Sequence, residues 1–366
     1  MVERKIEKRK ISHIEICSRK DVQARNITNC FGDIHLVHNA LPEIDLSDVQ
    51  LDTTLFGVKL KAPIMIEAIS GGASEAAKLN SILAETAEEL RIGLGLGSQR
   101  AALENPSLEY TYRIAREKAP NTLLIANLGA SQIAKGYKIE EAEKAIEMIS
   151  ANALAIHLNP LQEAVQIEGE PEFRGCISAI RRLTSRLHVP VIAKEVGSGI
   201  SKEVARILEK AGVRGIDVAG GGGTSWAAVE YYRAEEANDD IHKRLGLSFW
   251  DWGIPTAISL IEVKSATGIT AVASGGIRNG QEIAKAIALG ADAVGMALPL
   301  LRYALKGKEA LMGELSYMIQ ELQTTMFLVG ARNLEDLRMA PLVITGKTAE
   351  YMKSRGIGIE SYRSRA

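Results

Sequence analysis

The chain has no strong excess of either charge and no long hydrophobic run. Its 366 residues carry 44 Lys and Arg against 45 Asp and Glu, a formal net charge of -1. This balance provides no global field for nucleic acid or an acidic membrane, so we expect neither as a partner. No stretch approaches the roughly 20 apolar residues that a bilayer-spanning helix needs. The first ten residues, MVERKIEKRK, are charged. We therefore expect a soluble, unprocessed protein.

Cysteine is also scarce. Cys17, Cys30 and Cys176 lie far apart and form no C-x-x-C pair, which indicates neither a zinc site nor a disulfide framework. A reducing cytoplasm is the expected location. His35 and His38 have a spacing that occurs in metal sites, but without an acidic or cysteine neighbour it favours local packing.

Eight short runs rich in Ile, Val, Leu and Ala recur along the chain, each followed by a longer segment of helical periodicity. The runs are residues 63–70, 91–98, 121–129, 153–159, 190–197, 215–222, 270–276 and 293–300. Because they are almost continuously apolar, they are typical of parallel strands covered on both faces. Eight such β-then-α units predict a (β/α)8 TIM barrel. A doubly wound sheet is the alternative, and the even spacing of the units argues against it.

The domain organisation follows from this count. Residues 1–60 precede the first strand and are predicted to form an N-terminal extension packed on the barrel. The barrel is expected to span 61–345, and 346–366 to form a C-terminal tail. The connection after strand six, residues 224–253, is longer than usual for this fold and rich in aromatic side chains. We expect this long loop to act as a lid or a subunit contact.

Barrel enzymes place their chemistry at the carboxyl ends of the strands, and two of these ends are rich in glycine. Strand six ends in Gly220–Gly223 followed by Thr224, and strand seven ends in SGGIRNG. Without a Cβ atom, glycine lets backbone N–H groups approach an anion closely. Glycines can also serve only to turn tight corners, but four in a row beside SGGIR favour a phosphorylated ligand.

Other strand ends carry polar side chains. Lys194 ends strand five, where it would be desolvated and would need a partner such as a negatively charged ligand atom. The alternative is a pair with Glu195. Asn127 and Ser98 supply neutral hydrogen-bonding groups on strands three and two, although each could instead cap the following helix.

Strand four ends in the segment HLNPLQE, which brings together His157, Asn159, Gln162 and Glu163. A lone histidine is more often a satisfied core residue than a ligand. Here the row of amides and a carboxylate that follows His157 favours a functional role.

Several stretches together resemble a family of flavin-binding barrels. They include RKISHI, LFGVKLKAPIMIEAISGG, GLGLGSQRAALE, IHLNPLQEAVQ, VIAKEVGSGIS, DVAGGGGTSW and ASGGIRNG, and they cover nearly the whole chain. The chain is similar to the type 2 isopentenyl diphosphate isomerases, which interconvert isopentenyl and dimethylallyl diphosphate in isoprenoid biosynthesis with reduced FMN and Mg²⁺. One departure is Ile69-Ser70-Gly71-Gly72, where many relatives carry Met-Thr-Gly-Gly. Since serine keeps the hydroxyl group of threonine, we expect this segment to lose little of its function.

The resemblance implies a set of site residues. FMN would be bound by Ala68, Ile69, Ser70, Ser98, Asn127, Lys194, Thr224, Gly275, Gly276 and Ala297. The substrate diphosphate would be held by Arg9, Lys10, Ser98, Gln99, Arg100, His157 and Gln162. Mg²⁺ would be bound by Glu163, and catalysis would involve Gln162, His157 and Lys194. These residue types suit the ligands, because arginine and lysine pair with phosphates and Mg²⁺ needs few carboxylates when phosphates also bind it.

The resemblance also implies NADPH or another reductant for the flavin and a homo-oligomer, a tetramer or octamer.

Three alternatives remain open. A hydroxy-acid oxidase on the same barrel would carry a His-Gly-x-Arg motif, and a purine-nucleotide dehydrogenase would carry a cysteine in 224–253; the sequence has neither. A non-catalytic phosphate-binding scaffold is the third. Arg9 and Lys10 could also belong to a frayed basic tail.

Overall fold

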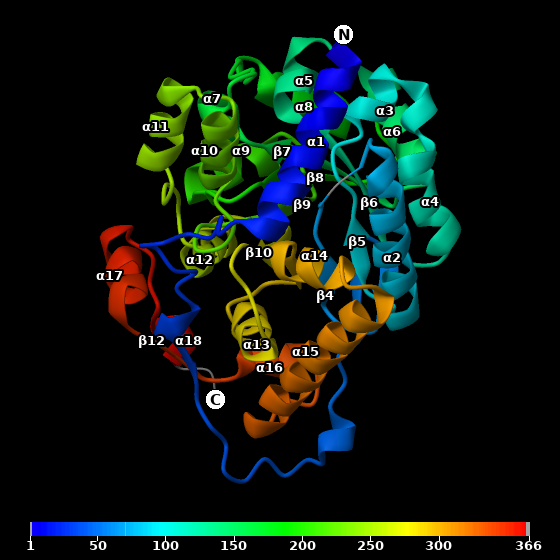
Figure 1. Ribbon diagram of the computed structural model, residues 1–366. Coiled ribbons are helices and arrows are strands. Elements are labelled where there is room, and N and C mark those ends of the chain that lie inside the picture. The colour runs from blue at the N-terminus through cyan, green and yellow to red at the C-terminus, as the bar shows by residue number, and fades with distance from the viewer. Residues whose placement is uncertain (1, 70, 364–366) are drawn as a thin grey trace.

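The computed structural model describes residues 2–69 and 71–363, and its centre is a closed barrel of eight parallel strands (Figure 1). The strands are β4 (Ile64–Ile66), β5 (Gly93–Gly95), β6 (Leu124–Gly129), β7 (Ala153–Leu158), β8 (Val191–Glu195), β9 (Gly215–Asp217), β10 (Thr270–Ser274) and β11 (Ala293–Met296). The barrel closes where β11 pairs with β4. The predicted (β/α)8 fold is therefore confirmed. The strands are shorter than the apolar runs because the last residues of most runs leave the ladder to form the mouth.

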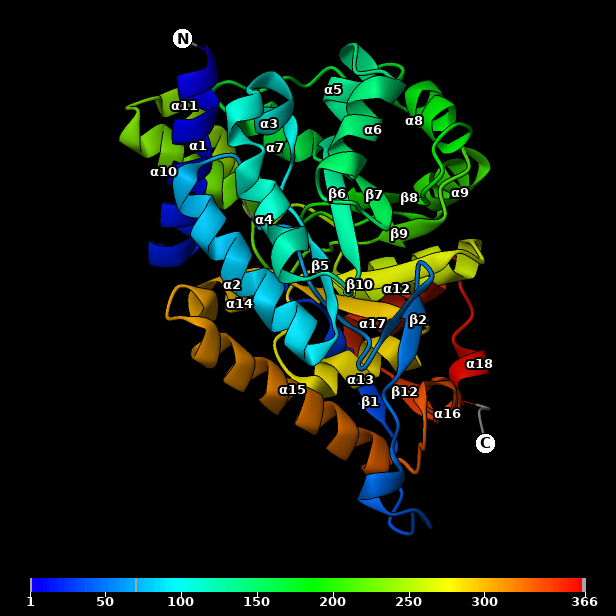
Figure 2. The ribbon, with the colours of Figure 1, turned by 90° about the vertical axis from the view of Figure 1, so that its right-hand side faces the viewer.

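Helices surround the barrel (Figure 2). They are α2 (Ser74–Leu90), α3 (Arg100–Glu104), α4 (Tyr110–Lys118), α5 (Ala130–Lys135), α6 (Ile139–Met148), α7 (Pro160–Val165), α8 (Cys176–Thr184), α9 (Lys202–Lys210), α12 (Thr256–Ala266), α13 (Gly280–Ala288), α14 (Leu298–Ala304), α15 (Lys308–Leu328) and α16 (Leu334–Met339). Short 3-10 turns occur at Phe31–Asp33, Leu46–Asp48 and Pro106–Leu108. Helix α9 illustrates how the sequence forms these helices. The Ser201 side chain accepts from the Val204 N–H at the start of the helix, and Ala205 and Leu208 are buried.

A hairpin from the N-terminal extension closes one end of the barrel. It consists of β2 (Thr53–Leu55) and β3 (Val58–Leu60), and its Leu55 and Leu60 are buried against residues at the beginnings of strands, such as Leu123 and Ala293. Because this end is filled with apolar side chains, only the carboxyl ends of the strands remain for a ligand site.

The rest of the extension covers that open end. Helix α1 (Val2–Arg19) packs against α3, α14 and α10 (Trp226–Glu236), and Figures 1 and 2 both show it alongside α10. Further along, β1 (Ile34–Leu36) pairs with β12 (Leu342–Ile344). This part of the chain therefore lies against helices of the barrel, and the division into an extension, a barrel and a tail stays a prediction. Arg9 and Lys10 lie within α1, so the alternative of a frayed basic tail is wrong.

Residues 224–253, the long connection after strand six, are mostly helical. They fold into α10 and α11 (Asp240–Ser248), which pack against each other. The aromatic side chains serve this packing: Trp250 is 4% exposed, lies edge-on to Tyr231 and Tyr232, and donates to the Gln23 carbonyl. A role as a subunit contact stays a prediction.

The C-terminal segment from residue 346 is also helical. It contains α17 (Gly346–Ser354) and α18 (Glu360–Arg363), and Met352 of α17 is fully buried. This segment is thus part of the packed structure as far as residue 363. None of the helices within the described ranges is long and apolar enough to cross a membrane.

Candidate active site

A cavity of about 250 Å³ lies at the carboxyl ends of the strands, beneath α1. It brings together nearly all of the predicted site residues. Those that line it are Arg9, Lys10, Ala68, Ile69, Ser98, Arg100, Asn127, His157, Gln162, Glu163, Lys194, Thr224, Gly275, Gly276 and Ala297. Ser70 lies outside the described residues.

Gln99 is not brought to the cavity. Its side chain is fully buried; Nε2 donates to the Ala145 carbonyl at 2.7 Å, and Oε1 accepts from the Asn127 N–H at 3.0 Å. The two ends of the amide therefore join the loop after β5 to α6, through Ala145, and to β6, through Asn127. This placement does not support the predicted contact between Gln99 and a substrate, which stays a prediction.

Lys194 lies at the base of the cavity between two carboxylates that the sequence reading missed. Its ammonium is 2.5 Å from Asp217 Oδ2 and 3.0 Å from Glu67 Oε2. Asp217 also accepts from the Ser274 hydroxyl at 2.6 Å. The signal for both acids was present in the sequence, since each is a single carboxylate in or next to a strand that is otherwise apolar.

The alternative partner, Glu195, does not reach Lys194. Its carboxylate accepts from the backbone N–H groups of Val196, Gly197 and Ser198. Burial lowers the pKa of Lys194, but Asp217 and Glu67 outweigh it and raise this pKa above its ordinary value. Lys194 is therefore a fixed positive charge in the cavity.

The glycine loops after β9 and β10 pack backbone against backbone. A Cβ atom on Gly275 would lie 2.3 Å from the Gly220 carbonyl oxygen, and one on Gly276 would lie 2.4 Å from that of Gly222. Within the two described ranges, the backbone N–H groups of Thr224, Gly275 and Gly276 have no protein acceptor. A phosphate at this position would supply acceptors for such donors.

Arg278 adds a cation to this part of the cavity and was not among the predicted residues. Its guanidinium donates to the Ile277 carbonyl and to Gln23, and burial lowers its pKa. The Arg in SGGIRNG, two residues after the glycine pair, was the available signal.

A second basic group comes from α1 and α3. Lys10 donates to the Ser98 carbonyl at 2.7 Å and to the Tyr112 hydroxyl at 2.6 Å. Arg100 is paired with Glu104 at 2.7 Å and with Glu170 at 3.2 Å. The charges of Arg9, Lys10 and Arg100 act on one another, whereas Arg278 is influenced by Glu282 and Arg302. The cavity therefore carries two groups of basic side chains, one with Arg9, Lys10 and Arg100 and one with Arg278.

Lys10 is expected to make anion binding depend on pH. Burial, followed by repulsion from Arg9 and Arg100, lowers the pKa of Lys10 to about 7. A bound anion favours the charged ammonium and raises this pKa. Below the free-state pKa, Lys10 is already charged; above it, binding must take up a proton, so affinity falls as the pH rises.

Calorimetric titration with pyrophosphate tests this expectation. Above the pKa of Lys10, the affinity of the wild type for pyrophosphate should fall with rising pH by up to about tenfold per pH unit. This fall is measured relative to the affinity of Lys10→Met at the same pH. The ionisation of pyrophosphate itself is common to both proteins and cancels in the ratio. A ratio that is constant across the neutral range would show that Lys10 does not titrate there.

His157 at the end of β7 is a neutral hydrogen-bonding group. Burial, then the charges of Lys194, Lys10 and Arg9, lowers its pKa to about 4. Its Nδ1 is 2.8 Å from Asn127 Oδ1, which makes Nδ1 the donor and leaves Nε2 as an acceptor. To donate to a phosphate through Nε2, as predicted, His157 would have to gain a proton or change tautomer when the anion binds. Gly129 gives the ring room, since a Cβ there would lie 2.9 Å from Nε2.

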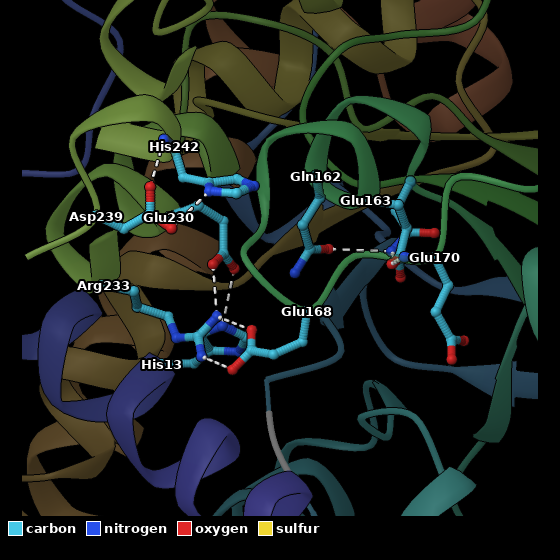
Figure 3. A network of polar contacts seen from close by, with 10 residues as sticks. His13, Gln162, Glu163, Glu168, Glu170, Glu230, Arg233, Asp239 and His242 are labelled. Atoms are coloured by element: carbon cyan, nitrogen blue, oxygen red, sulfur yellow. Dashed lines mark hydrogen bonds and ion pairs between the residues drawn. The ribbon is translucent and has the colours of Figure 1, made fainter. Parts of the chain in front are cut away.

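The segment that follows β7 presents an amide and a carboxylate to the cavity (Figure 3). Asn159 donates to both Gln162 Oε1 and Glu163 Oε1, at 3.2 and 3.0 Å. The other carboxylate oxygen of Glu163 accepts from the Glu170 N–H at 2.7 Å. Gln162 is left with its Nε2 group free to donate, and Glu163 is 9% exposed.

Protein side chains alone do not form a closed metal site here. No group of three or more His, Cys, Asp or Glu side chains that could hold a metal occurs in the described part of the chain. Glu163 is a single carboxylate, so a metal bound to it would need oxygen ligands from a phosphorylated substrate and from water.

Another polar network fastens α1 over the cavity (Figure 3). His13 is 3.0 Å from Glu230, Glu230 is 2.7 Å from Arg233, and Arg233 pairs with Glu168 at 2.7 Å. His13 also lies edge-on to Trp226, with ring centroids 5.0 Å apart. This network joins the N-terminal helix to α10 and to the segment after α7. Its residues are far apart in the sequence, so the sequence alone did not indicate it.

A closed barrel of eight parallel strands with a cavity at their carboxyl ends is the architecture of a TIM-barrel enzyme. The family model described as FMN-dependent dehydrogenase matches residues 2–109 and 125–344. Proteins named isopentenyl-diphosphate delta-isomerase are 48% identical in Methanosarcina mazei, over 96% of both chains, and 50% identical in Thermococcus onnurineus, over 95% of this chain and 94% of that one. The chain therefore belongs to the isopentenyl-diphosphate delta-isomerase family of FMN-dependent barrel proteins.

Solved structures of two oxidases share the fold. A lactate oxidase of Pediococcus acidilactici superposes with a TM-score of 0.65 at 16% identity, over 94% of each chain. A mandelate oxidase variant with (S)-mandelic acid gives 0.61 at 18% identity, over 92% of this chain and 94% of that one. At such low identity the likeness concerns the barrel and not the chemistry.

Proposed function

We propose that this protein interconverts isopentenyl and dimethylallyl diphosphate, using reduced FMN and Mg²⁺. The observation that carries the proposal is the presence of two basic groups in one cavity: Arg278 beside free N–H groups suits the phosphate of a flavin, and the group of Arg9, Lys10 and Arg100 suits a diphosphate. The names of the relatives that are 47–50% identical point to the same reaction. A protein that bound only a flavin would have no use for the second basic group.

The first site fits FMN. The free N–H groups of Thr224, Gly275 and Gly276, together with Arg278, are suited to its phosphate. Lys194 provides a positive charge for the ring, and Ala68 and Ala297 leave space for a flat ligand. When bound and reduced, FMN would supply acid–base chemistry at the double bond. NADPH or another reductant would be required to prepare it.

The second site fits the diphosphate and its metal. Arg9, Lys10 and Arg100 would neutralise the phosphates, displacing Glu170 from Arg100. Glu163 would hold Mg²⁺ jointly with phosphate oxygens. Anchoring the charged end of the substrate in this way would place its hydrocarbon end over the flavin, where α1 restricts water.

The chain's own residues would then orient the proton transfers. Isomerisation adds a proton at one carbon and removes one from another, so substrate and product have the same oxidation state. Gln162 would direct its free N–H group toward the reacting end, and Glu163 would hold the metal at the charged end of the substrate. His157 would help to hold the diphosphate. A homo-oligomer and a cytoplasmic location stay predictions.

A direct assay distinguishes this proposal from the oxidase alternative. Purified protein with FMN, Mg²⁺ and a reductant under anaerobic conditions should convert isopentenyl diphosphate to dimethylallyl diphosphate. A hydroxy-acid oxidase would instead consume oxygen when given lactate or mandelate. Oxygen consumption without isomerisation would restore that alternative.

A further inference from the structure

Glu67 is a buried carboxyl group at the base of the cavity with no role in the proposed function so far. It lies directly after β4 in the run PIMIEAIS and is 5% exposed. One of its oxygens, Oε2, contacts Lys194. The other, Oε1, is buried and has no hydrogen-bond partner within the described structure. Since burying an unpaired carboxylate is costly, this arrangement needs an explanation.

The barrel is shaped to contain this side chain. A Cβ atom on Gly295 of β11 would lie 2.1 Å from Glu67 Oε1 and 2.7 Å from its Cδ. On the other side, a Cβ on Gly95 of β5 would be 4.0 Å from Oε2. The two strands that flank β4 thus carry glycine at the level of the carboxyl group, and Gly295 is required for it to fit.

Two carboxylates face one lysine, and they are not equivalent. Asp217 is satisfied at both oxygens, by Lys194, by the Ser274 hydroxyl and, more weakly, by the Ala219 N–H at 3.2 Å. Among the described residues, Glu67 is paired with Lys194 through Oε2 and has no hydrogen-bond partner at Oε1. A proton on Glu67 therefore breaks fewer hydrogen bonds than one on Asp217, and it leaves the cluster neutral overall.

The surroundings of Glu67 also favour a proton on Glu67 over one on Asp217. Burial, followed by repulsion from Asp217, raises the pKa of Glu67 to about 7 despite the nearby Lys194. Its neighbours on β5 and β11 are glycines and carry no charge. On β7, His157 lies opposite Lys194 in the register and is neutral. Lys194 and Asp217 are thus the charges that control Glu67.

We propose that Glu67 is a proton store for the cavity. Its carboxylate takes up one proton from solvent when a negative charge forms beside Lys194, and it releases that proton when the charge is removed. This inference rests on the proposed binding of FMN, because two-electron reduction by an external reductant would create such a charge there. The step at Glu67 involves no electrons: a carboxylate and a proton become a carboxylic acid.

The proton store is tested by the pH dependence of the flavin reduction potential, which counts the protons taken up for every two electrons. Below the pKa of Glu67 the carboxyl group is already protonated in both redox states, so wild type and Glu67→Gln should agree. Above about 7, wild type should take up close to one proton more than Glu67→Gln. Glu195→Gln is the matched control, since Glu195 is also buried but bonds to backbone N–H groups instead of Lys194; it should behave like wild type.

Redox-difference infrared spectra of the wild type provide a measurement that does not depend on a variant folding. On reduction above about pH 7, a protonated-carboxyl band should appear. If flavin binds but neither the band nor the extra proton is found, the inference fails and the proposed function stands. If purified protein takes up no FMN at all, both fail.

Discussion

Replacing Lys194 by methionine is expected to remove the preference of this site for reduced flavin. The ammonium is the fixed positive charge that faces the cavity from β8, and Lys194→Met leaves only carboxyl groups in its place. A hydrogen bond to a charged group contributes about 1.5–3 kcal/mol, so reduced FMN should bind about 10- to 100-fold more weakly relative to oxidised FMN. The ratio follows from the reduction potentials of bound and free flavin.

The variant also leaves two buried acids without their partner, which can destabilise the fold by several kcal/mol. The double variant Lys194→Met/Asp217→Asn addresses this point, because it removes one of the stranded charges. It should fold better than the single variant and still lack the preference for reduced flavin. An unchanged ratio of affinities in either variant would mean that Lys194 does not face the flavin.

Glu163→Gln is expected to abolish activity at Mg²⁺ concentrations that saturate the wild type. Changes to groups that only support a metal ligand cost about 10- to 100-fold in affinity, and loss of the ligand itself should cost at least about 100-fold. The flavin spectrum should not change, because Glu163 contacts Asn159 and the Glu170 N–H and not the Lys194 cluster. The activity of each protein is measured across a Mg²⁺ titration.

Glu172→Gln is the matched control. Glu172 lies in the same segment and carries the same charge, but it is exposed and pairs with Lys135. It should need no more Mg²⁺ than wild type. If the Mg²⁺ titration of Glu163→Gln overlays the wild-type curve, the proposed binding of Mg²⁺ by Glu163 is wrong.

The barrel could be predicted from the sequence because its strands are buried on both faces. Runs such as 121–129 and 190–197 are mostly apolar, which is typical of parallel strands covered on both faces, and eight evenly spaced runs favour a barrel. The site residues at strand ends followed from the same argument. Lys194, Asn127 and His157 reach the cavity because parallel strands place their carboxyl ends at one mouth.

Other parts of the site depend on packing that is not visible in sequence. The direction of the Gln99 side chain is decided by free hydrogen-bonding groups at Ala145 and Asn127, which come from different elements. The pairing of Lys194 with Glu67 and Asp217 needs the register of three strands. The aromatic side chains of residues 224–253 favoured a lid or a subunit contact in the sequence, but aromatic side chains also pack between two helices, as they do here beside α10 and α11.

The central claim is that the reaction moves protons without net oxidation or reduction. The most direct measurement counts reductant consumed against dimethylallyl diphosphate formed, in strictly anaerobic D2O. We expect one reduction of the bound flavin to support many turnovers, with deuterium from the solvent incorporated into the product and with Gln162→Asn slowing the reaction while FMN remains bound. Consumption of one equivalent of reductant for each product molecule would contradict the claim and return the protein to the oxidoreductases of its fold.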